Sequence, residues 1–303
     1  MTGGHSRRNG VGSWASGRGV QSPLAPDLCR SARLTSYARP VPHAAPTWLL
    51  ALRGKFIAFE GPDGSGKTTQ YRRLLALLHE HAVPVCEVRE PGGTPIGEAI
   101  RQILLHTKDD MTLRCEMLLY MGSRAQLVQE RIRPSMLRGE VVLADRFVAS
   151  TLAYQGSAGG LPLDEIRAVA AVAVQGCWPD LNLVFDVDED TAARRIAPIV
   201  APAQHPSLFL PGGPHTPLGG GAPSGAGGFP SATREHHAPD RIESRGREFH
   251  RKVRFGYLEQ ARAQPDRHAI IDAVGSLDQV WDRVTRELGR RFAAKPERQH
   301  PPS

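Results

Sequence analysis

The sequence predicts an α/β protein in which helices cover both faces of a five-stranded parallel sheet, giving three layers. From Lys55 onward, short runs of β-branched and other apolar residues alternate with amphipathic stretches of helical period, a pattern typical of strand and helix units around a parallel sheet. A glycine-rich loop, Gly61–Thr68, follows the first of these runs directly, between a predicted strand and a predicted helix. The 303 residues are 40 % hydrophobic, which is enough for a sizeable core.

Five segments have the length and composition of strands: residues 55–60, 83–88, 140–145, 181–187 and 268–272. The spacing of apolar residues predicts helices over 67–82, 96–105, 114–138, 163–176 and 240–263, with one more after the fifth strand. The helix over 114–138 is apolar on one side, which indicates a core helix or an oligomer face, and we favour the core. The charged helix over 240–263 is expected to pack through Phe249, Val253 and Tyr257.

Three segments lie outside this pattern. Residues 1–53 and 290–303 are expected to be disordered extensions on either side of one domain, residues 54–289. Residues 198–239 hold runs of Gly and Pro without a period, which predicts a low-complexity insertion in that domain.

Most of the positive charge lies in the N-terminal extension. The whole chain has a formal net charge of +7, and residues 1–53 contain seven arginines, no lysine and one acid, Asp27, a local balance of +6. The remainder is close to neutral, so the core is not expected to bind nucleic acid. Besides plain disorder, three interpretations of the extension stay open: an organelle transit peptide, a nucleic-acid-binding arm, and a start site placed too far upstream.

The cysteines and the hydropathy pattern indicate a cytoplasmic protein without a membrane partner. Cys29, Cys86, Cys115 and Cys177 lie far apart and form no CxxC pair, so neither a zinc site nor a disulfide framework is expected. No apolar run approaches the roughly 18 residues that a membrane span needs.

The loop Gly61–Thr68 fits the pattern G-x-x-x-x-G-K-[ST], and its place between strand and helix predicts a phosphate-binding loop. In such a loop the backbone N–H groups and the helix N-terminus surround phosphate, Lys67 reaches the β and γ oxygens, and Thr68 coordinates Mg²⁺. A bound nucleoside triphosphate is therefore expected to contact Gly61, Pro62, Asp63, Gly64, Ser65, Gly66, Lys67, Thr68 and Thr69.

The acceptor of the phosphate decides the class of enzyme. A GTPase would need an NKxD motif, which is absent from the chain, and a motor or transporter ATPase would need a far longer chain. A small nucleotide kinase needs a second phosphate site built of arginines. In such an enzyme Asp63 can point away from the donor phosphates and hydrogen-bond a hydroxyl of the acceptor. An Asx turn that only stabilises the loop is the alternative.

Four stretches together resemble the thymidylate kinases, which phosphorylate dTMP with ATP: FEGPDGSGKTTQ, REPGGTPIGEAIR, DRFVASTLAYQG and DRIESRGREFHRKVRFGYLEQA. The resemblance covers about residues 55–288, interrupted by 198–239, and the order and spacing of the motifs make it specific. It implies the P-loop nucleoside-monophosphate-kinase fold, a homodimer, ATP and dTMP as ligands, and Mg²⁺ as the cofactor.

The resemblance also implies an acceptor site. Asp63 corresponds to the acid that contacts the deoxyribose 3′-hydroxyl, and Arg101 and Arg146 correspond to the arginines that hold the 5′-phosphate. Tyr120 corresponds to the ring that stacks on thymine, and Arg124 to the base's hydrogen-bonding partner. From the residues alone, an aromatic core contact with a solvated arginine is the alternative for this last pair.

Four more residues complete the implied acceptor site. Thr151 corresponds to a second thymine contact, and Tyr154 to the aromatic that would crowd a ribose 2′-hydroxyl. Gln155 lies beside it, and Glu90 belongs to the same pocket.

Catalysis is expected to need alignment and positive charge and no general base, because the acceptor phosphate is already anionic. Lys67 and Arg146 are the candidates for the charge, with Mg²⁺ positioned by Thr68 and Asp145.

No arginine occurs inside the phosphate loop, so the chain resembles the type that takes its catalytic arginine from the lid after the fourth strand. Arg234 is the favoured candidate and Arg195 the second. Because the insertion lies in this lid, a lid-impaired nucleotide-binding regulatory protein stays open, as does a related nucleoside-monophosphate kinase. His236 and His237, an adjacent pair, are expected to be polar surface and not a metal site.

Overall fold

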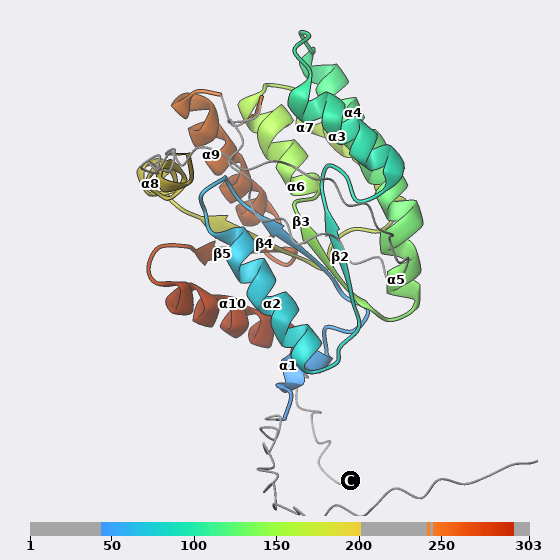
Figure 1. The fold of residues 1–303 in the computed structure, drawn as a ribbon, viewed down its shortest axis with the longest axis vertical. Coiled ribbons are helices and arrows are strands. Elements are labelled where there is room, and N and C mark those ends of the chain that lie inside the picture. Colours follow the sequence, from blue (N-terminus) through green and yellow to red (C-terminus); the bar gives the residue numbers. More distant parts are fainter. Residues whose placement is uncertain (1–43, 201–240, 243–244, 294–303) are drawn as a thin grey trace, which may run out of the picture. The chain divides into compact units, whose positions relative to one another are not determined.

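The computed structural model of the chain describes residues 44–200, 241–242 and 245–293 (Figure 1). These residues belong to one unit, residues 42–303. Most of the expected insertion, the candidate catalytic Arg234 and the pair His236 and His237 lie outside the described residues, as do residues 1–43 and 294–303.

A parallel sheet of five strands, in the order β2-β3-β1-β4-β5, forms the centre of this unit. The strands are Phe56–Glu60 (β1), Val85–Arg89 (β2), Val141–Asp145 (β3), Leu181–Asp186 (β4) and His268–Asp272 (β5). In the central register, Ala58 lies opposite Ala144 of β3 and Asn182 of β4. The prediction of five parallel strands is confirmed, each to within two residues.

The helices are Thr47–Leu50 (α1), Lys67–Glu80 (α2), Pro95–His106 (α3), Leu113–Leu127 (α4), Arg133–Leu137 (α5), Val148–Thr151 (α6), Leu163–Val174 (α7), Glu189–Val200 (α8), Arg247–Ala263 (α9) and Leu277–Phe292 (α10). Two π-helical segments continue α4 and α6: Val128–Ile132 (η1) and Leu152–Ala158 (η2).

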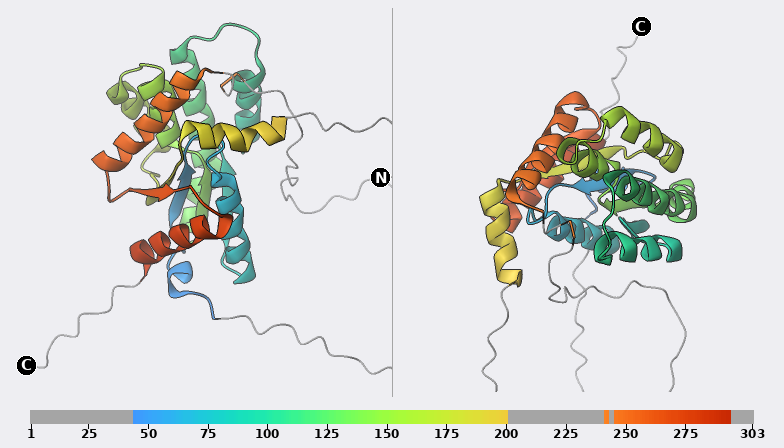
Figure 2. Two further views of the ribbon diagram at one scale, coloured as in Figure 1. Left: turned by 90° about the vertical axis from the view of Figure 1, so that its left-hand side faces the viewer. Right: turned by 90° about the horizontal axis from the view of Figure 1, so that it is seen from above.

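The side chains of β1 alternate between the two faces of the sheet and so divide the core. Ile57 and Phe59 pack with α1, α2 and α10. Phe56 and Ala58 pack with α4, η1 and α7 on the opposite face. Helices cover both faces of the sheet (Figures 1 and 2). A third cluster joins α3, η2 and α9. The expected three layers are therefore present.

The boundary expected at residue 53 is wrong for residues 44–53. Leu49 and Leu52 are fully buried in the cluster that contains β1, and Trp48 packs against the same cluster. At the other end, α10 runs through Phe292 and so passes the expected limit at residue 289.

The helix expected over 240–263 begins later, at Arg247. Gly246 precedes it as the N-cap, and Arg241 and Arg245 reach a buried carboxylate on α4 instead of continuing the helix. The long helix expected over 114–138 is divided into α4, η1 and α5, with Pro134 in the first turn of α5. Residues 148–158, for which no helix was predicted, form α6 and η2.

None of the helices in the described residues has the length and apolar content required to cross a bilayer.

Candidate active site

A cavity of about 230 Å³ opens at the carboxyl ends of β1 and β3, the edge at which open α/β sheets bind ligands. It is lined by all nine residues expected to contact the acceptor: Asp63, Glu90, Arg101, Tyr120, Arg124, Arg146, Thr151, Tyr154 and Gln155. Lys67, Thr68 and Asp145, which were expected on the donor side, line the same cavity. The fold thus brings the expected acceptor site and part of the expected donor site into one space.

The phosphate loop requires glycine at two of its positions. Gly61 and Gly64 have φ values of 138° and 78°. A Cβ at Gly61 would lie 2.6 Å from the Phe185 carbonyl oxygen, and one at Gly64 would lie 2.5 Å from the Ala192 carbonyl oxygen. The loop therefore fits closely against β4 and α8, because no side chain separates the backbones.

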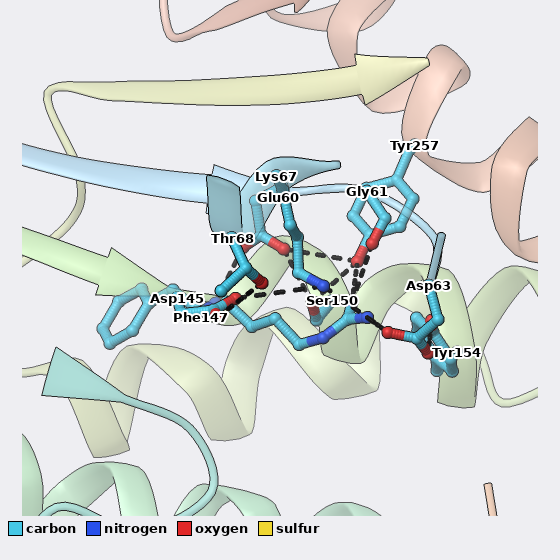
Figure 3. Close-up of polar contacts among 11 residues, drawn as sticks. Glu60, Gly61, Asp63, Lys67, Thr68, Asp145, Phe147, Ser150, Tyr154 and Tyr257 are labelled. Carbon is cyan, nitrogen blue, oxygen red and sulfur yellow. Dashed lines mark hydrogen bonds and ion pairs between the residues drawn. The ribbon is translucent and has the colours of Figure 1, made fainter. Parts of the chain in front are cut away.

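The N-terminal end of α2, which carries Lys67 and Thr68, lies against the last residue of β3. The Lys67 Nζ lies 3.4 Å from Asp63 Oδ1 and 3.9 Å from Asp145 Oδ1, and Thr68 donates to Asp145 Oδ2 over 3.5 Å (Figure 3). Asp145 Oδ1 is buried and accepts no hydrogen bond from the described residues, nor does the buried Ser65 hydroxyl find a partner there. Buried oxygens without a hydrogen-bond partner indicate a site where a bound polar group would supply the missing interaction.

Asp63 faces the acceptor side of the cavity. Its Oδ1 accepts from Arg146 Nη2 over 2.6 Å and its Oδ2 accepts from the Tyr154 hydroxyl over 3.5 Å (Figure 3). Burial alone would raise the pKa of Asp63, but the charges of Arg146 and Lys67 outweigh burial and hold the pKa well below its usual range. The side chain keeps 29 % of its surface exposed, so a ligand can still reach this carboxylate.

Arg146 is held at the junction of the phosphate loop and α6. Its φ of 70° turns the chain just after β3. Its Nη1 donates to the Gly61 carbonyl oxygen over 3.0 Å, to the Ser150 hydroxyl over 3.3 Å and to the Tyr257 hydroxyl over 3.1 Å. Burial opposes the charge, but Asp63 raises the pKa of Arg146 well above its usual value, so the guanidinium stays charged.

A buried ion pair forms the opposite wall of the cavity. Arg124 donates through Nε to both oxygens of Glu90, over 3.0 and 2.8 Å, and through Nη2 to the Thr151 hydroxyl over 3.1 Å. Burial raises the pKa of Glu90 to about 7, although Arg124 opposes this. The Arg124 side chain is only 1 % exposed, so the alternative of a solvated arginine beside Tyr120 is wrong.

Comparison with known proteins agrees with this geometry. The family model for thymidylate kinase matches residues 59–198. A protein named thymidylate kinase from Bifidobacterium longum subsp. infantis is 38 % identical over 241 residues, which cover 78 % of this chain and 87 % of the relative. The chain belongs to the thymidylate kinase family. A second thymidylate kinase, from Symbiobacterium thermophilum, is 39 % identical over 242 residues that cover 78 % of this chain and 95 % of the relative.

The fold of a solved thymidylate kinase is also similar. The crystal structure of thymidylate kinase from Ehrlichia chaffeensis matches with a TM-score of 0.53 at 25 % identity, over 77 % of this chain and 98 % of that chain. The resemblance drawn from the sequence motifs is therefore confirmed at the level of the family and of the fold.

Of the two lid arginines proposed for catalysis in this thymidylate kinase family member, the structure describes only Arg195. Arg195 is not among the lining residues. It donates to the Ala273 carbonyl oxygen over 2.9 Å and approaches the carbonyl oxygens of Gly64 and Ser65 at 3.5 Å, behind the phosphate loop. Arg234 lies outside the described residues. On the acceptor side, Arg101 does line the cavity, where its Nη1 donates to the Pro91 carbonyl oxygen over 2.9 Å.

Sequence reasoning missed a polar cluster beneath the phosphate loop. Glu60 is fully buried at the end of β1 and accepts from the Phe147 amide over 2.8 Å, the Ser150 hydroxyl over 2.6 Å and the Tyr257 hydroxyl over 3.3 Å. Burial raises the pKa of Glu60. Tyr257 was expected only to pack, and its hydroxyl also lies 2.7 Å from Ser150 (Figure 3). The one signal for this cluster was an acid that ends an otherwise apolar strand.

Proposed function

We propose that this chain transfers the γ-phosphoryl group of ATP to dTMP. The observation that carries the proposal is one cavity lined both by Asp63, Lys67 and Thr68 of the phosphate loop and by every residue expected to bind the acceptor. Membership of the thymidylate kinase family supports the same activity.

The donor side of the site would consist of Gly61–Thr69, with the loop backbone around the β-phosphate and Lys67 at the β and γ oxygens. Arg195, bound to loop carbonyl oxygens, would then lie beside the donor nucleotide.

The acceptor side would use a cation at each end of the nucleotide. Arg101 and Arg146 would hold the 5′-phosphate, and Tyr120 and Arg124 would hold the base by stacking and hydrogen bonding. Asp63 would accept from the 3′-hydroxyl, an acceptor role that its lowered pKa supports.

The remaining acceptor residues would shape the pocket around base and sugar. Tyr154 lies within 3.5 Å of Asp63, which supports a place next to the sugar, where its ring would exclude a ribose 2′-hydroxyl. Thr151 and Glu90 both contact Arg124 and would keep its guanidinium directed at the base. Gln155 would be the further base contact.

Catalysis would rest on alignment and charge. The acceptor phosphate can attack the γ-phosphorus without losing a proton, so no residue has to act as a general base. Lys67 Nζ and Arg146 Nη2 both contact Asp63 Oδ1, at 3.4 and 2.6 Å, and so bring positive charge from the phosphate loop and from the end of β3 to one point. Such charge stabilises the oxygens of the transferred group in the transition state.

The residues present fit a magnesium ion. Thr68 offers a hydroxyl, and Asp145 offers a carboxylate whose Oδ1 accepts no hydrogen bond from the described residues. When bound with ATP, Mg²⁺ would neutralise charge on the β- and γ-phosphates.

We further propose that this kinase is of the type with lid arginines. The loop Gly61–Thr68 contains no arginine, so the remaining charge must come from elsewhere. Arg234 is our first candidate, because Arg195 is already engaged with backbone carbonyl oxygens.

We also propose that the enzyme is a homodimer and that it is located in the cytoplasm. The exposed Leu118 and Val172, on the neighbouring helices α4 and α7, support a surface for a second copy.

The test is a coupled assay of ADP release with dTMP, dUMP, UMP and AMP as acceptors. We expect dTMP to have the highest kcat/KM. Faster turnover of UMP or AMP would replace the substrate assignment with a related nucleoside-monophosphate kinase, and tight binding of ATP and dTMP without ADP release would favour the regulatory protein.

The same assay tests the lid arginine. Arg234→Ala should lower kcat by about 10³-fold or more, as removal of an arginine finger does in other phosphoryl-transfer enzymes. Arg247→Ala is the matched control, because this exposed arginine pairs with Asp190 on α8 and does not line the cavity. Equal activity of both variants would exclude Arg234 as the catalytic arginine.

A further inference from the structure

Glu116, a residue of α4 with no assigned role, is a buried carboxylate that receives three donors. It is fully buried. Its Oε1 accepts from Gln155 Nε2 over 2.7 Å, and its Oε2 accepts from Arg241 Nη2 over 2.5 Å and from Arg245 Nη2 over 2.8 Å. A buried carboxylate is costly unless it is paired and hydrogen-bonded, and these three donors meet that need.

Two of the groups around Glu116 reach the cavity. Gln155 and Ile242 both line it, and both are buried. Arg241, next to Ile242 in the chain, also donates through Nε to the Leu104 carbonyl oxygen on α3 over 3.1 Å. Glu116 therefore joins η2, α4 and the segment that leads into α9, just behind one wall of the acceptor pocket.

The chemistry of the carboxylate determines how Gln155 is oriented. An ionised carboxylate can only accept hydrogen bonds, so the Gln155 amide must turn its NH₂ group toward Glu116. Within the described part of the chain this is the one side-chain hydrogen bond of Gln155. The carbonyl oxygen Oε1 is then the polar atom that remains for a ligand in the cavity.

This wall is the one expected to meet the base. Gln155 follows Thr151 by four residues, which places both on one side of the α6 and η2 helix, and Thr151 is bonded to Arg124. A donor from Arg124 and an acceptor from Gln155 would then face the same edge of the base. Thymine and uracil carry an N3–H donor beside a carbonyl acceptor on that edge, whereas cytosine carries an N3 acceptor beside an amino donor.

We propose that Glu116 is a positioning residue for base selection: it holds Gln155 with its carbonyl oxygen toward the cavity and so favours a pyrimidine that donates at N3. The inference rests on the proposed function, because it assumes that the cavity takes dTMP. It goes beyond that function because Glu116 does not touch the substrate, but determines whether Gln155 presents an acceptor or a donor to it.

Glu116→Gln gives a directional test. Arg241 and Arg245 need an acceptor, so they would take the oxygen of the new amide and turn its NH₂ group toward Gln155. Gln155 would then have to accept, and its own NH₂ group would face the cavity. The variant should lower the ratio of kcat/KM for dTMP to that for dCMP by about tenfold or more, mainly through a raised KM for dTMP. The KM for ATP should stay unchanged.

Glu165→Gln is the matched control. Glu165 on α7 pairs with Arg114 of α4, with one contact of 2.5 Å, but its side chain keeps 43 % of its surface exposed and does not line the cavity. Its substitution should leave the selectivity ratio unchanged. An unchanged ratio in a folded Glu116→Gln variant, with only a lower melting temperature, would overturn the inference and assign Glu116 a purely structural role.

Gln155→Met keeps the test decisive if Glu116→Gln does not fold. This substitution leaves Glu116 and both arginines in place and removes only the acceptor, so the preference for dTMP over dCMP should fall, with the remaining preference due to Arg124. A Gln155→Met enzyme with the selectivity of the unmodified chain would refute the inference. Failure of the unmodified chain to phosphorylate dTMP would refute the proposed function itself, so the two failures are distinguishable.

Discussion

Replacing Asp63 by Asn should weaken the turnover of dTMP far more than that of its 3′-deoxy analogue. Asp63 Oδ1 contacts Arg146 at 2.6 Å and Lys67 at 3.4 Å, whereas Oδ2 has, among the described residues, the single 3.5 Å contact with the Tyr154 hydroxyl. The second oxygen is thus the one available to a 3′-hydroxyl. Asparagine keeps the shape of the side chain but removes its charge and presents one acceptor instead of two.

The size of the effect follows from the kind of hydrogen bond that is lost. A hydrogen bond to a charged group contributes about 1.5 to 3 kcal/mol, which corresponds to about 10- to 150-fold in kcat/KM. The substitution also weakens the contact with Arg146, but that loss applies to both nucleotides and cancels when they are compared. The ratio of kcat/KM for dTMP to that for 3′-deoxy-dTMP should therefore fall by about 10- to 150-fold.

The assay is ADP release with each nucleotide at saturating ATP, for the unmodified chain and for Asp63→Asn. Asp190→Asn serves as the control, because this exposed aspartate also pairs with an arginine, Arg247, but lies away from the cavity. Equal loss of activity toward both nucleotides would show that Asp63 acts only on Arg146 and the loop, and would refute the contact with the sugar.

Three further outcomes are expected. The pKa of Glu90 is raised from 4.5 to about 7, so the folded protein keeps a proton there that the unfolded chain releases. The free energy of unfolding by urea should therefore fall between about pH 4.5 and 7, and Glu90→Gln should make that fall smaller. Gly64→Ala, which would place a Cβ 2.5 Å from the Ala192 carbonyl oxygen, should weaken ATP binding in a titration, whereas Gly139→Ala, with a similar φ of 73° and open space around it, should not. Leu49→Ala should lower the free energy of unfolding by about 2 to 5 kcal/mol, and a negligible change would place that residue outside the folded unit after all.

The strands were predictable because a strand that is buried on both faces consists of a continuous run of apolar residues. β1 is buried at all five positions and is bounded by a Gly-rich loop, so composition and length defined it. The order of the strands is different, because it depends on contacts between segments that no local pattern reports. The helix over 148–158 was missed for a related reason: it begins with four residues of α6 and continues as a π-helical segment, which lacks the usual 3.6-residue spacing.

For the site, the sequence motifs predicted which residues meet but not how they are paired. Arg124 and Glu90 are 34 positions apart, and only the fold turns a solvated-looking arginine into half of a buried ion pair. Glu60 and Glu116 show the same limit. An acid at the end of an apolar strand is the one signal for Glu60, and no sequence pattern marks Glu116 as buried. Their partners, Tyr257 for Glu60 and Arg241 for Glu116, lie more than 100 residues further along the chain.

The segments before and after residues 201–240 are each bound to the folded unit by their own hydrogen bonds. On one side Arg195 is bonded to Ala273 and lies against the phosphate loop, and on the other side Arg241 and Arg245 are bonded to Glu116. The position of each flank is therefore set by its own contacts with the folded unit: Arg195 by the residue that follows β5, and Arg241 and Arg245 by α4.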